Sequence, residues 1–140
     1  MGNKYSETIK DGNDAHNYFL KTTSRSVVIE FHNLTAADFR LQDSLIIHGD
    51  NLLQELQETI RKDTFHYICH GSNGIMTGVQ GWASYISSGG ITMKILWECD
   101  YIGISMVTID VNNYMFTKTE FEDSTKNNIH IKLELKNIEF

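Results

Sequence analysis

The chain of 140 residues has no proline, only two cysteines and no long apolar run. Two cysteines cannot build a disulfide framework, and we expect Cys69 and Cys99 to be free, buried thiols unless their strands prove to be neighbours. No window approaches the ~20 apolar residues that a membrane-spanning helix needs, and residues 1–25 lack the apolar core of a signal peptide. These absences favour a single soluble domain, which a chain of this length can stabilise by its core alone.

Positive charge is also scarce. The chain has 12 Lys and Arg against 18 Asp and Glu, which gives a formal net charge of −6. Nucleic-acid binding depends largely on Lys and Arg at phosphates, so we expect no nucleic-acid partner. Strong attraction to anionic membranes is disfavoured for the same reason, whereas zwitterionic lipid is compatible with this composition.

Sequence motifs of common enzyme classes are missing as well. There is no Gly-x-Ser-x-Gly, no phosphate-binding loop and no His-Glu-x-x-His. The nearest approach to a metal site is His66, Cys69 and His70 in FHYICH. On a strand the two histidines share a face and Cys69 points the opposite way, so the three cannot close one local site. We therefore predict a protein that is not an enzyme, without metal or cofactor, in which these three residues have structural roles.

Apolar and polar residues alternate along most of the chain from Ser26 onward, as they do in half-buried strands. The clearest case is NIHIKLEL, where Ile129, Ile131, Leu133 and Leu135 face one way and polar residues the other. Many short alternating strands of this kind predict an all-β fold, a single antiparallel β-sandwich. The predicted strands are residues 26–33, 38–42, 65–69, 81–87, 91–98, 105–111, 114–121 and 128–135.

Candidate turns separate these segments. Gly89–Gly90 and Asn112–Asn113 stand where hairpin turns need positive φ. Residues 51–62, NLLQELQETIRK, fit either a helix face or an irregular strand, and periodicity does not decide between them. Asn33-Leu34-Thr35 is an N-glycosylation sequon, which matters only in a secretory pathway.

Residues 1–25 are polar, with Gly, Asn, Ser and Thr scattered through them. Asp14 is suited to cap a short helix that carries Tyr18 and Phe19 on one side. We interpret residues 1–25 as a polar N-terminal extension that folding does not require, and residues 26–140 as the sandwich domain.

Glycine and large aromatics are concentrated in two stretches. GSNGIMTGVQGWASYISSGG, residues 71–90, combines many glycines with Trp82, and LWECDYIG, residues 96–103, carries Trp97 and Tyr101. Trp82 and Trp97 lie inside alternating strands, which favours core positions over membrane contact. Tyr101 and Ile102 fall in a predicted loop, where an apolar pair has less reason to be buried. Trp and Tyr rings also suit a membrane–water interface.

Several segments, in order, resemble the aegerolysin family. Fungal members carry Trp-Asp-Cys followed by Pro-Trp-Gly in a loop, and WECDYIG at 97–103 stands at the matching place. VVIEFHN at 27–33 resembles the family's first strand, and RKDTFHYICHGSNG at 61–74 resembles the segment with its other recurrent cysteine. SNGIMTG at 72–78 is most similar to the bacterial insecticidal branch, the small partners of binary crystal toxins. The resemblance extends from about Val27 to the C-terminus.

The resemblance implies a β-sandwich similar to the actinoporins and the binding of membrane lipids, in fungal relatives sphingolipids. It also implies a larger partner protein that assembles the pore, and release or deposition in crystal inclusions. We therefore predict the lipid-binding component of a two-component pore-forming, insecticidal toxin. The alternative is a carbohydrate- or protein-binding sandwich without membrane activity.

Carried over residue by residue, the resemblance places Tyr101 where the fungal loop has a membrane-facing Trp. His48 stands where another interfacial Trp precedes a Gly, and Thr77 stands near an acidic residue that tunes lipid choice. The sequence departs from the fungal pattern at all three positions. The predicted lipid-binding residues are Tyr101, Ile102, His48, Trp97, Thr77 and Trp82.

Overall fold

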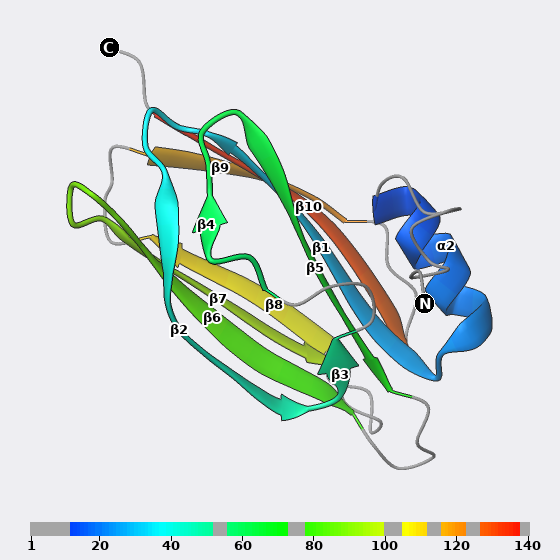
Figure 1. Ribbon diagram of the computed structural model, residues 1–140. Coiled ribbons are helices and arrows are strands. Elements are labelled where there is room, and N and C mark those ends of the chain that lie inside the picture. Colours follow the sequence, from blue (N-terminus) through cyan, green and yellow to red (C-terminus); the bar gives the residue numbers. More distant parts are fainter. Residues whose placement is uncertain are drawn as a thin grey trace, which may run out of the picture.

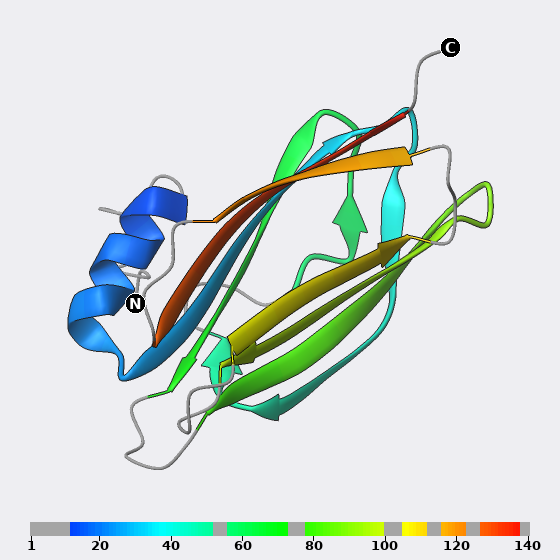
Figure 2. The same ribbon diagram turned by 180° about the vertical axis from the view of Figure 1, so that it is seen from behind.

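Two five-stranded β-sheets pack face to face, and a helix lies against the outer side of one of them (Figures 1 and 2). The computed structural model describes residues 12–51, 56–72, 78–99, 105–111, 116–122 and 127–137. This architecture confirms the predicted all-β sandwich.

Each sheet combines strands that follow one another in sequence with strands that are distant in sequence. Sheet 1 contains, in spatial order, β3 (Asp50–Asn51), β5 (Thr64–Ser72), β1 (Arg25–Leu34), β10 (Asn128–Asn137) and β9 (Phe116–Glu122). Sheet 2 contains β4 (Thr59–Ile60), β2 (Phe39–His48), β6 (Val79–Ser87), β7 (Thr92–Cys99) and β8 (Ser105–Val111).

The pairing departs from the predicted antiparallel pattern at one place. β1 and β10 run parallel at the centre of sheet 1, with Ser26 opposite Asn128 and Phe31 opposite Leu133. Alternation within a strand is the same for both pairing directions, so the sequence pattern does not distinguish them.

The predicted turns have different outcomes. Gly90 has a φ of +81° between β6 and β7, which confirms the hairpin at Gly89–Gly90. The predicted hairpin at Asn112–Asn113 is wrong, because the strands on either side, β8 and β9, belong to different sheets. The two asparagines themselves lie outside the described residues. Within the ambiguous stretch 51–62, Thr59–Ile60 forms the short strand β4.

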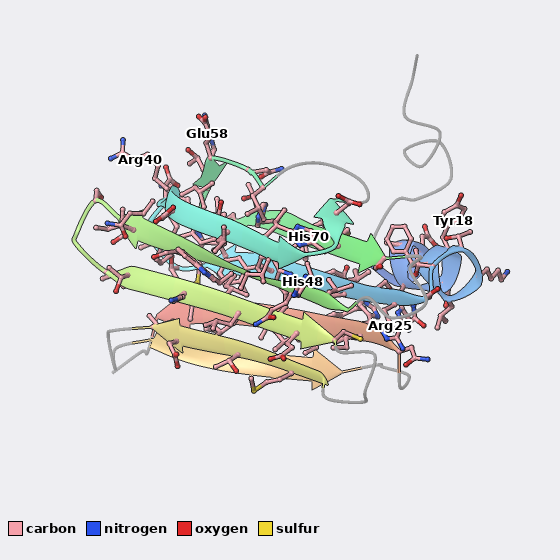
Figure 3. All side chains as sticks on the ribbon, turned by 90° about the horizontal axis from the view of Figure 1, so that it is seen from below. Tyr18, Arg25, Arg40, His48, Glu58 and His70 are labelled. Atoms are coloured by element: carbon pink, nitrogen blue, oxygen red, sulfur yellow. The ribbon has the colours of Figure 1, made fainter. Side chains whose placement is uncertain are left out.

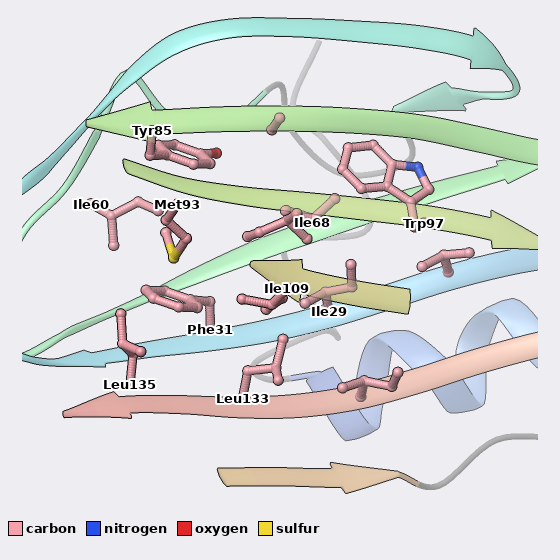
Figure 4. Close-up of a cluster of buried hydrophobic side chains, with 14 of the residues drawn as sticks. Ile29, Phe31, Ile60, Ile68, Tyr85, Met93, Trp97, Ile109, Leu133 and Leu135 are labelled. Carbon is pink, nitrogen blue, oxygen red and sulfur yellow. The ribbon is translucent and has the colours of Figure 1, made fainter. Parts of the chain in front are cut away.

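The space between the sheets is filled by large apolar side chains (Figure 4). The four residues of the cleanest alternating segment, Ile129, Ile131, Leu133 and Leu135, are all buried there, as predicted. Phe31 from sheet 1 and Phe39, Tyr85 and Trp97 from sheet 2 contribute the largest rings. This core, formed by side chains from both sheets, holds the layers together.

Helix α2 (Gly12–Thr22) confirms the predicted short helix and packs on the outer face of sheet 1. The predicted cap at Asp14 is wrong, because the helix begins at Gly12 and Asp14 lies within its first turn. Ala15 and Phe19 form a second apolar cluster with Val28 and Cys69. The ring of His16 also stacks on His130 of β10, with centroids 5.0 Å apart. The second half of the predicted N-terminal extension therefore covers part of the sheet, although the boundary at residue 25 stays a prediction.

Candidate functional site

Exposed apolar side chains gather on the outer face of sheet 2, toward one end of the sandwich. Leu45 and Ile47 on β2 and Met106 on β8 are 51%, 44% and 51% exposed. Between them lie the partly exposed Trp82 of β6 and Leu96 of β7. We call these five residues the sheet 2 patch.

Strand register brings the members of the patch together. Leu45 is opposite Trp82, and Trp82 is opposite Leu96, so the three side chains form a row across three strands. Met106 is opposite Glu98, two residues along β7 from Leu96 on the same face. Directly opposite side chains lie within about 5.5 Å at their Cβ atoms, so the row presents one continuous surface.

An irregularity in β2 adds to this surface. The pairing register between β2 and β6 shifts between Ile46 and His48. An extra residue of this kind bends a strand and changes which side chains face outward. As a result, the consecutive residues Ile47 and His48 are both exposed.

The charges around the patch are mixed. The Lys94 ammonium lies 4.6 Å from the centre of the Trp82 ring, a cation–π contact that leaves the ring partly exposed. Glu98 is opposite Met106, and Asp110 is opposite Lys94. The patch is therefore an apolar surface bordered by both signs of charge, without a concentrated cationic field.

The predicted lipid-binding residues fall into three groups. His48, which is exposed and labelled in Figure 3, and Trp82 lie on the same outer face, because His48 is opposite Gln80, two residues from Trp82. Trp97 instead points into the core and is 1% exposed. Thr77, Tyr101 and Ile102 lie outside the described residues.

The described residues that flank these three positions lie at the same end of the molecule as the patch. Cys99 and Ser105, on either side of 100–104, pair with each other at the ends of β7 and β8. Val79, at the start of β6, is also opposite Cys99. Val79, Cys99 and Ser105 thus lie on adjacent strands at the end of the sandwich where the patch lies.

Trp97 explains one of the glycines in the stretch 71–90. A Cβ atom added at Gly81 would lie 2.7 Å from Cζ2 of the Trp97 ring and 3.0 Å from the carbonyl oxygen of Leu45. Only a residue without a side chain fits beneath this indole. Gly81 therefore serves core packing of the tryptophan opposite it.

His66 and His70 share the inner face of β5 and Cys69 lies on the outer face, as predicted. His66 Nε2 is 3.1 Å from the Tyr85 hydroxyl, and the His70 ring meets the Trp97 ring edge to face, with centroids 4.7 Å apart.

Burial lowers the pKa of both histidines, His66 and His70, to about 4. Burial, with a smaller effect of Glu30, raises the pKa of the Cys69 thiol to about 12. At neutral pH these groups are uncharged core residues.

Both cysteines are free and buried. Within the described ranges, no group of three or more His, Cys, Asp or Glu side chains is placed to hold a metal ion. No helix in the same part of the chain has the length and apolarity to cross a membrane.

Sequence reasoning missed Leu45, Ile47 and Met106. A signal was present, because Leu45-Ile46-Ile47 interrupts the alternation of β2 with three consecutive apolar residues. Such an interruption is typical of a bulge or of an apolar side chain on the solvent face.

No family model matches the sequence, and no curated protein matches it significantly. Solved structures do match. The lipid binding protein Nakanori has a TM-score of 0.69 at 11% identity, over 88% of this chain and 77% of that chain. RahU, solved in complex with a TRIS molecule, has a TM-score of 0.64 at 10% identity, over 84% of this chain and 98% of that chain. A variant of the lectin XCL of Xerocomus chrysenteron has a TM-score of 0.50 at 8% identity, over 79% of this chain and 97% of that chain. At these identities the likeness establishes a shared fold.

Proposed function

We propose that this chain is a membrane-lipid-binding protein and that the sheet 2 patch is its lipid-facing surface. The observation that carries the proposal is the gathering of Leu45, Ile47 and Met106, all strongly exposed, beside Trp82. Scattered apolar residues are normal on a protein surface, whereas a contiguous apolar group marks an interaction site. The shared fold with a lipid binding protein supports this choice of ligand.

The proposal places the protein among the aegerolysins, as the sequence resemblance implies. In that role it is the lipid-recognising component of a two-component pore-forming toxin, and a larger partner protein makes the pore. Three half-exposed apolar side chains can each contribute only about 1 kcal/mol on full burial. Such a surface binds weakly alone, which suits a subunit that gains avidity from clustered lipid or from a partner.

Charge favours zwitterionic headgroups. The chain carries a net charge of −6, and beside the patch the two acids Glu98 and Asp110 outnumber Lys94. Both features oppose a negatively charged bilayer. Sphingomyelin and phosphatidylcholine are therefore better candidate ligands than phosphatidylserine, and a sphingolipid preference is part of the proposal.

Co-sedimentation with vesicles tests this function. The panel contains phosphatidylcholine alone, phosphatidylcholine with sphingomyelin and cholesterol, and the latter mixture with phosphatidylserine added. We expect binding to the sphingomyelin mixture, weaker binding when phosphatidylserine is added, and no release of trapped dye by this chain alone. Absence of binding to every vesicle would contradict the proposal.

The alternative is a carbohydrate- or protein-binding module, and the lectin XCL shares the fold. A glycan array run beside the vesicle panel separates the two. Binding to neutral glycans without binding to vesicles would favour the alternative, and then the patch would have another partner.

A further inference from the structure

A polar hollow lies at the other end of β2 and β6 from the sheet 2 patch. Its volume is about 430 Å³, within the range of small-ligand sites. The polar side chains that line it come from the loop after β1, from the start of β2, from the region of β4 and from the end of β6: Asp38, Arg40, Thr59, Lys62, Ser87 and Ser88. Figure 3 shows Arg40 at the end of the molecule away from α2.

The loop after β1 forms one wall of the hollow. It is held by the buried side-chain amide of Asn33, whose nitrogen and oxygen both have hydrogen-bond partners. Asn33 Nδ2 donates to the carbonyl oxygens of Ala37 and Ile60, at 2.8 and 3.2 Å. Asn33 Oδ1 accepts from the backbone nitrogen and the hydroxyl of Thr35, at 3.1 and 2.6 Å. Asn33 is fully buried, so this first residue of the sequon is a structural residue in the folded chain.

The segment that follows β4 forms the second wall of the hollow, and hydrogen bonds connect it to the loop after β1. Asp38 Oδ1 accepts a hydrogen bond of 2.8 Å from the backbone nitrogen of Lys62, and the backbone nitrogen of Asp63 donates to the Asn33 carbonyl oxygen at 2.7 Å. Asp63 has a φ of 60°, a conformation that is uncommon for a residue with a side chain. Two chain segments are thus fixed relative to each other, which is the preorganisation that a binding site needs.

The cationic groups of the hollow form no salt bridge with any residue in the described part of the chain. Among the described residues neither the Arg40 guanidinium nor the Lys62 ammonium has an ion-pair partner. Asp38 is the one acidic residue in the lining, and one of its oxygens already accepts the Lys62 backbone nitrogen. Two cations against one carboxylate leave a positive site on a protein whose net charge is −6.

Hydroxyl groups complete the lining. Ser87 is 5% exposed, and its oxygen accepts a hydrogen bond of 3.2 Å from the backbone nitrogen of Ile91, which leaves its proton to donate. Thr59 and Ser88 offer two more hydroxyls. None of the described residues that line the hollow is aromatic, so this lining offers no stacking surface of the kind that neutral sugar rings prefer.

We propose that this hollow binds a small oxyanion, a phosphate or sulfate group carried on a polar ligand. A guanidinium fork, an ammonium and several hydroxyl donors form the donor set that recognises tetrahedral oxyanions. The site lies at the far end of the strands from the lipid-facing surface, so one molecule can hold both ligands at once. The hollow therefore gives the protein a second specificity, independent of the apolar patch.

Titration of the ¹⁵N-labelled protein with inorganic phosphate and with inorganic sulfate tests the proposal by NMR. We expect saturable shifts of the amides of Lys62 and Ser88. The double variant R40Q/K62Q should weaken the apparent affinity at least tenfold. The matched double variant R61Q/K136Q removes the same charge at exposed positions outside the hollow and should stay within twofold of the parent. Shifts no larger than those from sodium chloride at equal ionic strength would overturn the proposal, as would equal weakening by both double variants.

Two further arms identify the source of the oxyanion. One uses phosphatidylcholine vesicles that contain phosphatidic acid, and the other uses a sulfated heparin oligosaccharide. Weaker binding of R40Q/K62Q than of R61Q/K136Q in the first arm assigns the group to a lipid headgroup, and the same result in the second arm assigns it to a saccharide.

Discussion

Gly81 and Trp97 show how one small residue determines the placement of a large one. The indole of Trp97 packs against Gly81 on the neighbouring strand. It occupies the space that a methyl group at Gly81 would need. We expect Gly81→Ala to destabilise the fold by about 1–3 kcal/mol, because the core must shift to admit the extra carbon.

Gly89→Ala is the matched control, since the nearest atom to its added Cβ is the Ser87 hydroxyl at 3.8 Å. Urea unfolding of both variants measures the difference. Equal stabilities for the two would show that the indole moves freely to accommodate a side chain.

His66 and His70 link the stability of the core to pH. Their pKa values are near 4 in the folded protein, against an ordinary value of 6.5, because burial disfavours the charged ring. The unfolded chain therefore binds protons between pH 6.5 and 4 that the folded chain does not. Stability is fully present above pH 6.5 and falls as the pH is lowered through this window.

His70→Leu removes one of these two protonation sites. We expect the parent to lose about 2 kcal/mol per buried histidine between pH 7 and pH 5, and the variant to lose about 2 kcal/mol less. Urea midpoints across this range measure the loss. A variant with the same dependence on pH as the parent would place the acid sensitivity elsewhere.

Helix α2 is the element whose contribution differs most from the expectation drawn from sequence. Phe19 is 1% exposed and packs on sheet 1 with Ala15, Val28 and Cys69. We expect Phe19→Ala to cost about 3 kcal/mol, because truncation of a buried ring leaves a cavity. Leu20 is adjacent and 39% exposed, so Leu20→Ala should cost less than about 1 kcal/mol.

Thermal unfolding of the two variants measures this difference. If Phe19→Ala melts like the parent, α2 contributes nothing to the fold, and the predicted dispensability of residues 1–25 is supported. If it melts lower, as we expect, removal of these residues should expose Val28 and Cys69 and destabilise sheet 1.

The elements that the sequence predicts well are those in which burial alternates regularly. In β10, every second side chain from Ile129 to Leu135 enters the core, so the period of two identifies both the strand and its inner face. The parallel pairing of β10 with β1 could not be predicted, because it is set by contacts between segments 102 residues apart.

The candidate site was harder to predict than the fold. The alternation in β2 is interrupted by register shifts, so the outward positions of Leu45 and Ile47 follow from pairing with β6 and not from local sequence. Trp97 suits an interface by residue type, whereas the alternation of its strand favours the core, and the opposite residue Gly81 makes room for it there. Residue type alone does not decide which side of a sheet an aromatic occupies.

The whole molecule presents different chemistry at the two ends of its strands. One end carries the apolar patch with Trp82, and the other carries the polar hollow with Arg40 and Lys62. The rigid sandwich between them keeps the two surfaces apart. This separation is what the two proposals require, because a lipid surface at one end and an oxyanion at the other can then be bound without overlap.

Vesicle binding by matched surface variants tests the lipid-facing role of the sheet 2 patch most directly. L45S/M106S removes two exposed apolar side chains from the patch, and F65S/L20S removes two from the side of sheet 1. Both variants are first checked for an unchanged melt and then sedimented with sphingomyelin, cholesterol and phosphatidylcholine vesicles. We predict that L45S/M106S binds more than tenfold more weakly than the parent and that F65S/L20S stays within twofold. Equal binding by L45S/M106S and the parent, or a greater loss in F65S/L20S, would contradict the account.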